Sequence, residues 1–298
     1  LRCALADYVR ERRNVVTAPE HIVVGAGVQM LLEILCVLLK GRRTVSFPDG
    51  SFVQGSTVFA AHGYTVRTRY KDADIIYVSP SHMNRQGDVM PIQRRLELCA
   101  YSADTGAVVI EDDFENDFLY SSTPTPSLYA LGSGNVVYMG AFSALLLPGI
   151  RISFMVLSPA LAAAYHQMKD TFAQTASKTE QIALCAYLRD GNMKSRTKKI
   201  RRLYTGKAKT LCALLAKALP DHPVRVGENG LQVQIETPML PDSAPFEQAG
   251  LALYIVKEKS GKNIVVVSPS AVPADRLEEA AHAVAAALYK AEEAAKAK

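Results

Sequence analysis

The sequence predicts an α/β fold, with a mainly parallel sheet of about seven strands and a smaller α+β unit toward the C-terminus. Two observations lead to this prediction. From Val15 to Leu157, short β-branched runs alternate with helical patterns, as in parallel sheets that helices cover on both faces. After Pro159, two long helical stretches precede short strands and a final helix. In folds of this kind, binding residues lie in the loops at the carboxyl ends of the strands.

The individual elements follow in chain order. The first part should contain strands at residues 21–24, 43–47, 65–67, 74–78, 107–110, 136–139 and 152–157, and helices at 28–40, 51–61 and 92–101. The second should contain helices at 160–173 and 179–218, strands at 224–226, 231–235, 253–256 and 264–267, and a helix at 274–294. The helix at 179–218 should break near Asp190-Gly191. We therefore expect a large domain at residues 1–185 and a small C-terminal domain at 186–298.

Length and composition describe an ordinary globular chain, whose 298 residues, 49% of them hydrophobic, can bury a large core. No apolar run reaches the roughly 18 to 20 residues that span a bilayer, so membrane insertion is not expected. The first residues lack the pattern of a signal peptide, and the five cysteines are odd in number and widely spaced, which indicates reduced thiols in a cytoplasmic protein. No pair with CxxC spacing suggests a metal site. Because the chain starts at Leu1 and not at Met, we expect the large domain to be N-terminally incomplete.

A basic cluster contributes to the net charge of +5. Such a cluster could follow a phosphate backbone. Apolar residues recur among these charges at helical spacing, which favours the solvated face of an amphipathic helix. The cluster comprises Lys194, Arg196, Lys198, Lys199, Arg201 and Arg202.

An acidic group follows the strand at residues 107–110, where the chain reads Glu111-Asp112-Asp113-Phe114. A carboxylate at a buried strand end is costly unless a cation or a hydrogen-bond donor meets it. By itself this pattern could also bind a metal or cap a turn.

Four further motifs occur along the chain, three before the acidic strand end and one after it. Together the five resemble the cofactor motifs of the aminotransferase domains in MocR/GabR-type transcription regulators, which belong to the fold type I aminotransferases. The resemblance covers residues 1 to about 214. The motifs are Gly25-Ala26-Gly27-Val28-Gln29, Pro48-Asp49-Gly50-Ser51-Phe52, the segment from Val78 to Pro91 with Asn84, and the segment from Tyr138 to Phe154 with Arg151.

The resemblance implies a site for pyridoxal 5'-phosphate. Gly27, Val28 and Gln29 open a helix after a strand, where free amides and the helix dipole can hold a phosphate. Phe52 would stack on the pyridine ring, although core packing explains it equally well. Asn84 would face the phenolic oxygen of the cofactor, and its alternative is a turn residue.

Three more positions complete the implied site. Asp112 would pair with the pyridine nitrogen and keep it protonated, which makes the ring an electron sink. Arg151 would hold the phosphate with its planar guanidinium, and Ser143 would add a hydroxyl.

The sequence departs from the family pattern at the catalytic lysine and at several positions that bind the cofactor or the substrate. Ala144 occupies the position of the lysine that forms the Schiff base, so no catalytic residue is expected there. Phe114 replaces the tyrosine that would face the phenolic oxygen, and Ala141 replaces a phosphate-binding hydroxyl residue. Gln54 stands where some members have an arginine, and Arg85 where a proline is usual. The last strand lacks the arginine that binds the substrate carboxylate.

These residues support two hypotheses. The first is an effector-binding domain of a MocR/GabR-type regulator that binds a small amino acid or amine, holds the cofactor noncovalently, weakly or not at all, and does not transaminate. The alternative is an active aminotransferase captured as a Lys-to-Ala variant. An unrelated α/β domain with chance matches is a remote third reading. The resemblance further implies a homodimer, and DNA contact only through a winged-helix domain outside this chain.

Overall fold

The computed structural model describes residues 1–84, 86–114, 126–132, 134–257 and 261–296. The chain forms two compact units. The described residues of the first unit fall in Leu1–Met83, Val89–Asp117 and Thr123–Thr197. Those of the second fall in Asn84–Asp88 and Lys198–Lys298, so a short segment before residue 89 belongs with the C-terminal part of the chain. The division near residue 197 lies inside the long helix α8 (Asn192–Ala218).

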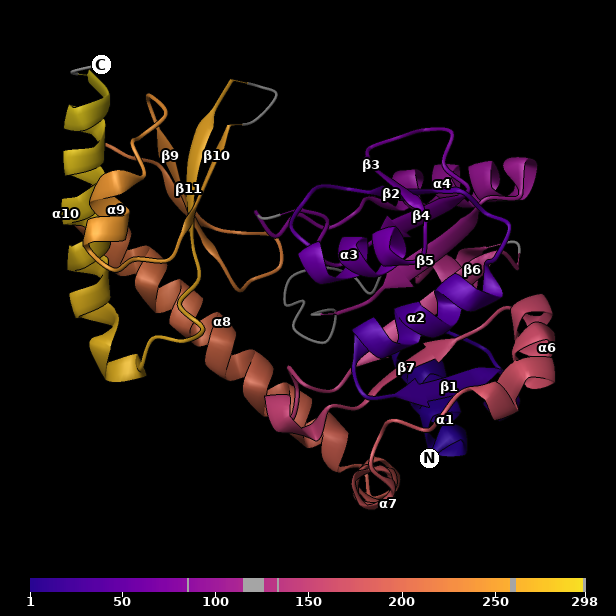
Figure 1. The fold of residues 1–298 in the computed structure, drawn as a ribbon. Helices are drawn as coiled ribbons and strands as arrows, with labels where there is room; N and C mark the ends of the chain where they lie inside the picture. The colour runs from indigo at the N-terminus through magenta and orange to yellow at the C-terminus, as the bar shows by residue number, and fades with distance from the viewer. Residues whose placement is uncertain (85, 115–125, 133, 258–260, 297–298) are drawn as a thin grey trace. The chain divides into compact units, whose positions relative to one another are not determined.

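The first unit is built on a seven-stranded sheet with the order β1-β7-β6-β5-β4-β2-β3 (Figure 1). Strands β2 to β6 pair in parallel, and β7 is antiparallel to both of its neighbours, β1 and β6. The mainly parallel sheet predicted from the sequence is therefore confirmed. The strands are β1 (Ile22–Gly25), β2 (Thr44–Phe47), β3 (Thr65–Thr68), β4 (Ile75–Val78), β5 (Val108–Asp112), β6 (Val136–Ala141) and β7 (Ser153–Val156).

Helices cover both faces of this sheet. On one face, Leu31 and Leu35 of α2 and Phe59 of α3 form a core with strand residues such as Ile110 and Val137. On the other face, side chains of α4 and α5 pack on β5 and β6. The helices of the first unit are α1 (Arg2–Arg13), α2 (Val28–Leu38), α3 (Val53–Ala61), α4 (Ile92–Thr105), α5 (Leu128–Leu131), α6 (Pro159–Met168), α7 (Lys178–Arg189) and the start of α8.

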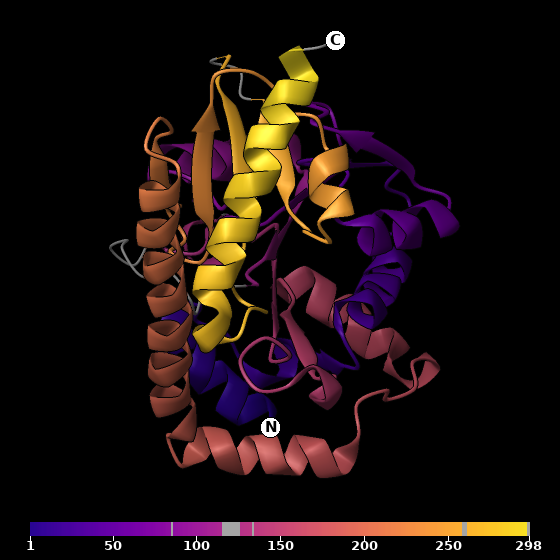
Figure 2. The same ribbon diagram turned by 90° about the vertical axis from the view of Figure 1, so that its left-hand side faces the viewer.

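The second unit contains an antiparallel sheet with the order β10-β11-β9-β8. Helix α10 lies across this sheet beside α8, and both contribute to one apolar core (Figure 2). A buried pair, His222 Nε2 and Glu292 Oε1 at 2.9 Å, ties the turn after α8 to α10. The elements are β8 (Val224–Val226), β9 (Val233–Thr237), α9 (Ala244–Gln248), β10 (Tyr254–Lys257), β11 (Asn263–Val267) and α10 (Leu277–Lys296).

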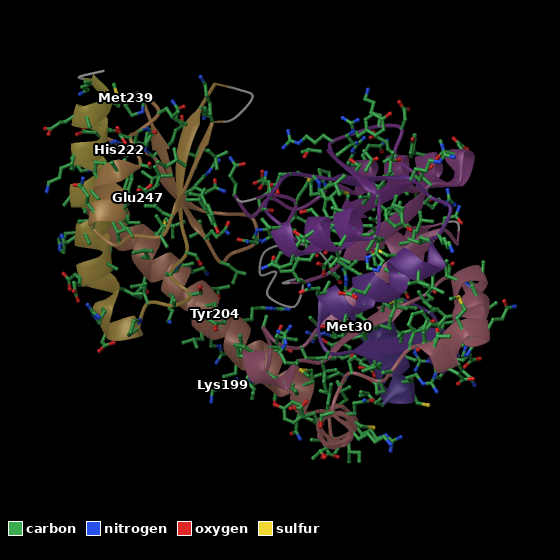
Figure 3. All side chains as sticks on the ribbon, viewed as in Figure 1. Met30, Lys199, Tyr204, His222, Met239 and Glu247 are labelled. Carbon is green, nitrogen blue, oxygen red and sulfur yellow. The ribbon has the colours of Figure 1, made fainter. Side chains whose placement is uncertain are left out.

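The basic cluster lies on α8, where Figure 3 labels Lys199 and Tyr204. Met193, Thr197 and Ile200 are buried at helical spacing, and the lysines between them are exposed. The lysines of the cluster thus lie on the polar face of an amphipathic helix, as the spacing indicated, whereas Arg196 is half-buried. No helix in the described part of the chain is both long and apolar enough to cross a membrane.

Candidate cofactor site

The register of the large sheet places three of the five predicted motifs at one end of the strands. Asp112, the last residue of β5, pairs with Met139 of β6. Two residues later Ala141 pairs with Ser153, which in turn pairs with Gly25 at the end of β1. The loops that carry Gly27, Arg151 and the residues after Asp112 therefore leave the same edge of the sheet.

Asp112 is buried and only half satisfied. Its Oδ2 accepts a hydrogen bond from the Tyr77 hydroxyl, whereas its buried Oδ1 has no hydrogen-bond partner in the part of the chain that the structure describes. Burial raises the pKa of Asp112 to about 6, against the opposing effect of the hydrogen bonds from Tyr77 and from the backbone of Phe114. A buried acceptor without a donor is costly, so Oδ1 is suited to a donor brought by a ligand.

Phe52 lies beside this pair. It precedes α3, its ring centroid is 5.2 Å from that of Tyr77, and the ring lies against the backbone of Gly55. A Cβ on Gly55 would come within 2.2 Å of the Phe52 ring, so glycine is needed for this packing. Phe52 remains half-buried. The structure thus brings Phe52, Tyr77 and Asp112 together.

Gly27 and Arg151 form a second pair in the same unit. Gly27 is the N-cap of α2 with φ +96°, and a Cβ there would lie 2.5 Å from Arg151 Nη2. The guanidinium therefore lies directly against the start of α2, whose first N–H groups, including those of Val28 and Gln29, lack intrahelical acceptors. The preceding Ala26 N–H donates to Thr175 Oγ1 at 3.0 Å, a contact that the sequence did not predict. Positive charge and free N–H groups converge here, as an anion requires.

A charged network lies behind Asp112. Because side chains alternate along a strand, Glu111 and Asp113 point away from the face that holds Asp112. Asp113 accepts from Arg13 Nε at 2.6 Å, from the Tyr138 hydroxyl at 2.8 Å and from the Ser81 hydroxyl at 2.8 Å. Sequence analysis missed this network, which fixes α1 to the end of β5.

Glu111 completes the network. Its carboxylate accepts the N–H groups of Leu128 and Tyr129 at the start of α5, at 2.9 and 3.0 Å. Burial and the charge of Asp113 raise its pKa to about 7, while Arg13 opposes that rise. Arg95, also buried, donates to the backbone carbonyls of Met90 and Pro126 at 3.0 Å each.

The segment that contains the expected lysine position forms a turn after β6. Ser143 is half-buried and Ala144 is exposed. Arg196 of α8 anchors this turn, because its guanidinium donates to the carbonyls of Leu145 at 3.3 Å and Leu146 at 3.4 Å. Phe114, on the neighbouring strand end, has its ring 5.2 Å from that of His82.

Asn84 belongs to the second unit and is fully engaged in its own turn. Its Oδ1 accepts from the N–H groups of Gln86 and Asp88, and its Nδ2 donates to Gln86 Oε1 at 3.1 Å and Asp88 Oδ2 at 2.7 Å. Gln234 of β9 donates to the Gln86 carbonyl at 2.8 Å. Arg85 lies outside the described residues. The geometry shows Asn84 as a turn residue, and its expected contact with the cofactor stays a prediction.

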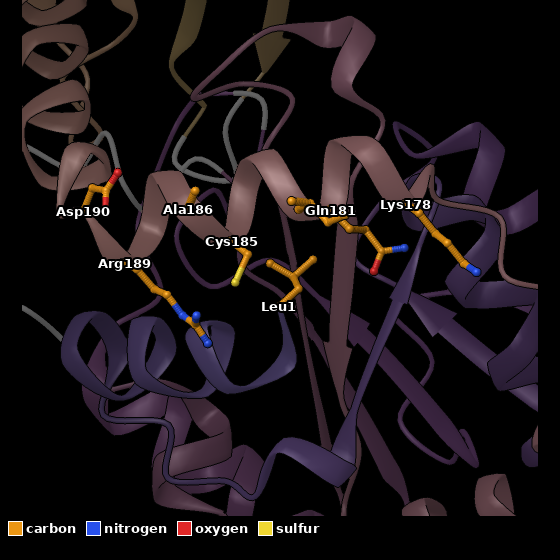
Figure 4. Close-up of a pocket in the computed structure, with 8 residues that line it drawn as sticks. Leu1, Lys178, Gln181, Cys185, Ala186, Arg189 and Asp190 are labelled. Atoms are coloured by element: carbon orange, nitrogen blue, oxygen red, sulfur yellow. The ribbon is translucent and has the colours of Figure 1, made fainter.

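Lys178 lies exposed at the start of α7. It lines a cavity of about 570 Å³ together with Leu1, Gln181 and Cys185 (Figure 4). That cavity contains none of the residues predicted to hold the cofactor.

Comparison with known proteins shows the family and the fold. A family model described as aminotransferase class I and II matches residues 1–267, so the chain belongs to this family. An archaeal alanine:glyoxylate aminotransferase has a similar structure, with a TM-score of 0.81 and 20% identity over 97% of this chain and 80% of that one. LysN, the alpha-aminoadipate aminotransferase of Thermus thermophilus, was solved with N-(5'-phosphopyridoxyl)-L-leucine. Its TM-score is 0.75 and its identity 23%, over 97% of this chain and 82% of LysN. The fold is that of the fold type I aminotransferases.

Curated relatives point to transcription regulators that contain this fold. The chain is 30% identical over 284 residues to YdeL of Bacillus subtilis (strain 168), described as an uncharacterized HTH-type transcriptional regulator. This covers 90% of the chain and 59% of YdeL. It is 28% identical over 250 residues to the probable rhizopine catabolism regulatory protein MocR of Rhizobium meliloti, over 79% of the chain and 50% of MocR. The chain thus spans about half the length of the curated relatives it matches.

Proposed function

We propose that this chain is the effector-binding, aminotransferase-like domain of a MocR/GabR-type transcription regulator, and that it holds pyridoxal 5'-phosphate noncovalently without transaminating. The observation that carries the proposal is the buried, unpartnered Oδ1 of Asp112 beside the half-buried ring of Phe52, among the residues that the structure describes. Regulators of this type among the relatives, and the family match, support the same conclusion.

The charges around Asp112 fit such a cofactor. Among the described residues, the guanidinium groups of Arg13 and Arg95 act on Glu111 and Asp113, which point away from Asp112. Asp112 is influenced by burial, by hydrogen bonds from Tyr77 and the Phe114 backbone and by the charge of Asp113, so its carboxylate has no counterion among these residues. A protonated pyridine nitrogen would supply the positive charge that balances the Asp112 carboxylate, and it would donate a hydrogen bond to Oδ1. A hydrogen bond to an ionised acceptor is a strong one.

The other residues have corresponding tasks. Arg151 and the N–H groups of Val28 and Gln29 would bind the phosphate, and Phe52 would cover the ring. When bound, the cofactor supplies an electron sink. Ala144 has no amine, so the chain can neither form a covalent bond to the cofactor at this position nor move a substrate proton from it. A small amino acid or amine would therefore act as an effector and not as a substrate.

The partners follow from the same proposal. We expect a homodimer, and DNA contact only through a winged-helix domain outside this chain. Light scattering of the purified chain tests the first expectation, since a monomer at high concentration would contradict it.

Titration with pyridoxal 5'-phosphate, followed by absorption and equilibrium dialysis, tests the function. We expect saturable binding that dialysis reverses and that borohydride does not trap. Asp112→Asn should weaken binding at least about tenfold, because the amide cannot balance the ring charge. Asp104→Asn, an exposed position on α4, is the matched control and should bind as the unaltered chain does. Absence of saturable binding, or equal binding by Asp112→Asn, would contradict the proposal.

A further inference from the structure

The Tyr77 hydroxyl donates a hydrogen bond to the buried carboxyl group of Asp112. It lies on β4 opposite Ile110 of β5, so its side chain shares a face of the sheet with Ile110 and Asp112. The side chain is buried, and its ring centroid lies 5.0 Å from that of Phe47 and 5.2 Å from that of Phe52. These contacts hold the ring in place and direct the hydroxyl at Asp112 Oδ2.

The hydrogen bond has two consequences for the carboxyl group. A tyrosine hydroxyl carries one proton, and here Oδ2 accepts it, which fixes the rotation of the carboxyl group. Oδ1 is then the atom without a partner among the described residues. Donation to the ionised form also opposes the effect of burial on the pKa of Asp112.

We infer that Tyr77 is a positioning residue, which keeps Asp112 ionised and directs its Oδ1 toward the ring nitrogen of the bound cofactor. The part of this inference that concerns the cofactor rests on the proposed function. The part that concerns the ionisation of Asp112 is a property of this chain alone. The two parts can be measured separately.

The variant is Tyr77→Phe, which removes the hydroxyl and keeps the ring that packs on Phe47 and Phe52. The matched control is Tyr64→Phe. Tyr64 is also buried in the core of the first unit, and its hydroxyl donates to the Cys36 carbonyl at 2.9 Å. Circular dichroism and thermal melts establish that both variants fold. Both lose one buried tyrosine hydroxyl, but only Tyr77→Phe changes the contacts of Asp112.

The first measurement needs no cofactor. The ¹³C chemical shift of the Asp112 carboxyl carbon is followed against pH in the unaltered chain and in both variants. Because the lost hydrogen bond favours the ionised form, Tyr77→Phe should titrate at a higher pH, by about one pH unit. Tyr64→Phe should titrate as the unaltered chain does. Equal midpoints in all three proteins overturn the inference whether or not the chain binds pyridoxal 5'-phosphate.

The second measurement is the dissociation constant of pyridoxal 5'-phosphate as a function of pH. Tyr77→Phe should bind about tenfold more weakly than the unaltered chain near pH 7. As the pH is lowered, Tyr77→Phe should also lose its affinity at a higher pH than the unaltered chain does. The ionisations of the cofactor are common to both variants, so comparison with Tyr64→Phe isolates the effect on Asp112. If the unaltered chain binds and Tyr77→Phe matches Tyr64→Phe, the positioning role is wrong while the proposed function stands.

A double variant separates positioning from packing. In the Asp112→Asn background, Tyr77→Phe should cause no further loss of affinity, because the hydroxyl acts through the carboxylate. Additive losses would show that Tyr77 contributes to binding independently of Asp112, and would overturn the inference.

Discussion

The guanidinium of Arg151 lies so close to Gly27 that a Cβ on the glycine would be 2.5 Å from Arg151 Nη2. A side chain at Gly27 would be strained by its φ of +96° and would displace the exposed Arg151 guanidinium. The pair joins the start of α2 to a residue two positions before β7, although 124 positions separate Gly27 and Arg151 in the sequence.

Gly27→Ala should weaken the binding of pyridoxal 5'-phosphate at least about tenfold, because Arg151 must move away from the helix start. The positive φ should also lower the free energy of unfolding by about 1–2 kcal/mol. Gly41→Ala is the control, since Gly41 has φ +107° and nothing within 4 Å of an added Cβ. Dialysis and urea denaturation of both variants should show a similar loss of stability but a loss of affinity only for Gly27→Ala. Equal affinities would contradict the assigned phosphate contact.

The pH dependence of stability provides a prediction for Asp112 without any ligand. Its pKa is about 6 in the folded chain, above the ordinary value of 3.8. A raised carboxyl pKa stabilises the fold at low pH, and this contribution is lost as pH rises from about 4 to about 6. Asp112→Asn resembles the protonated form, so it should be more stable than the unaltered chain by about 1–3 kcal/mol at pH 8, with the difference fading toward pH 4.

Urea denaturation of both proteins across this range measures the difference. Glu111 and Asp113 also have raised pKa values, but both proteins contain them, so subtraction largely removes their effect. Asp104→Asn, on the surface of α4, should show no such trend. Asp112→Asn would thus gain stability and lose cofactor binding, as expected where function retains an unfavourable group. A pH-independent difference would argue against a raised pKa for Asp112.

Much of the fold could be predicted because its elements have strong local patterns. The alternation from residue 15 to 157 predicted the sheet, and the break in the helical pattern at residues 190–191 matches the boundary between α7 and α8, where Gly191 has φ +71°. Helix α1 was not predicted. Its buried residues, Ala4, Leu5, Val9 and Arg13, recur at helical spacing on one face, but the apolar part of this stripe is short and the stripe ends in an arginine.

The contacts that support the site were less accessible to sequence analysis. Tyr77 stands in an apolar strand and resembles a core residue, and its role depends on the register between β4 and β5. Arg13 follows other basic residues and resembles a surface charge, yet its partner Asp113 lies 100 residues later. Asp113 stands in the acidic motif that the sequence analysis identified. Because side chains alternate along β5, however, Asp113 binds Arg13 on the face opposite Asp112. Such pairings follow from tertiary structure and carry no local signal.

The turn around Asn84 leads to a prediction about the second unit. Asn84→Ala removes four hydrogen bonds within residues 84–88 and should lower the free energy of unfolding by about 1–2 kcal/mol. Asn135→Ala is the control, because the side-chain hydrogen bond of Asn135 to the Ser102 carbonyl is long, at 3.4 Å. Urea denaturation compares them. An unchanged stability together with weaker cofactor binding would instead favour the role that the family resemblance implies.

The last prediction concerns Ala144. A lysine at this exposed position should react with bound pyridoxal 5'-phosphate, giving a new visible absorption band and a borohydride-trapped adduct in the mass spectrum. Leu147→Lys, on another exposed residue of the same loop, controls for adventitious reaction with a surface lysine and should give neither.

Ala144→Lys should not restore amino transfer. The lysine would return the nucleophile and the proton carrier, but Phe114 would still lack the expected hydroxyl, and β11 would still lack an arginine to bind a substrate carboxylate. Turnover with a panel of amino acids and 2-oxo acids measures this directly. A domain that has lost only its lysine would regain rapid turnover, which would favour the alternative of an aminotransferase captured as a Lys-to-Ala variant. A covalent adduct without turnover is the outcome that an effector-binding domain requires, because the residues that orient a substrate are missing independently of the lysine.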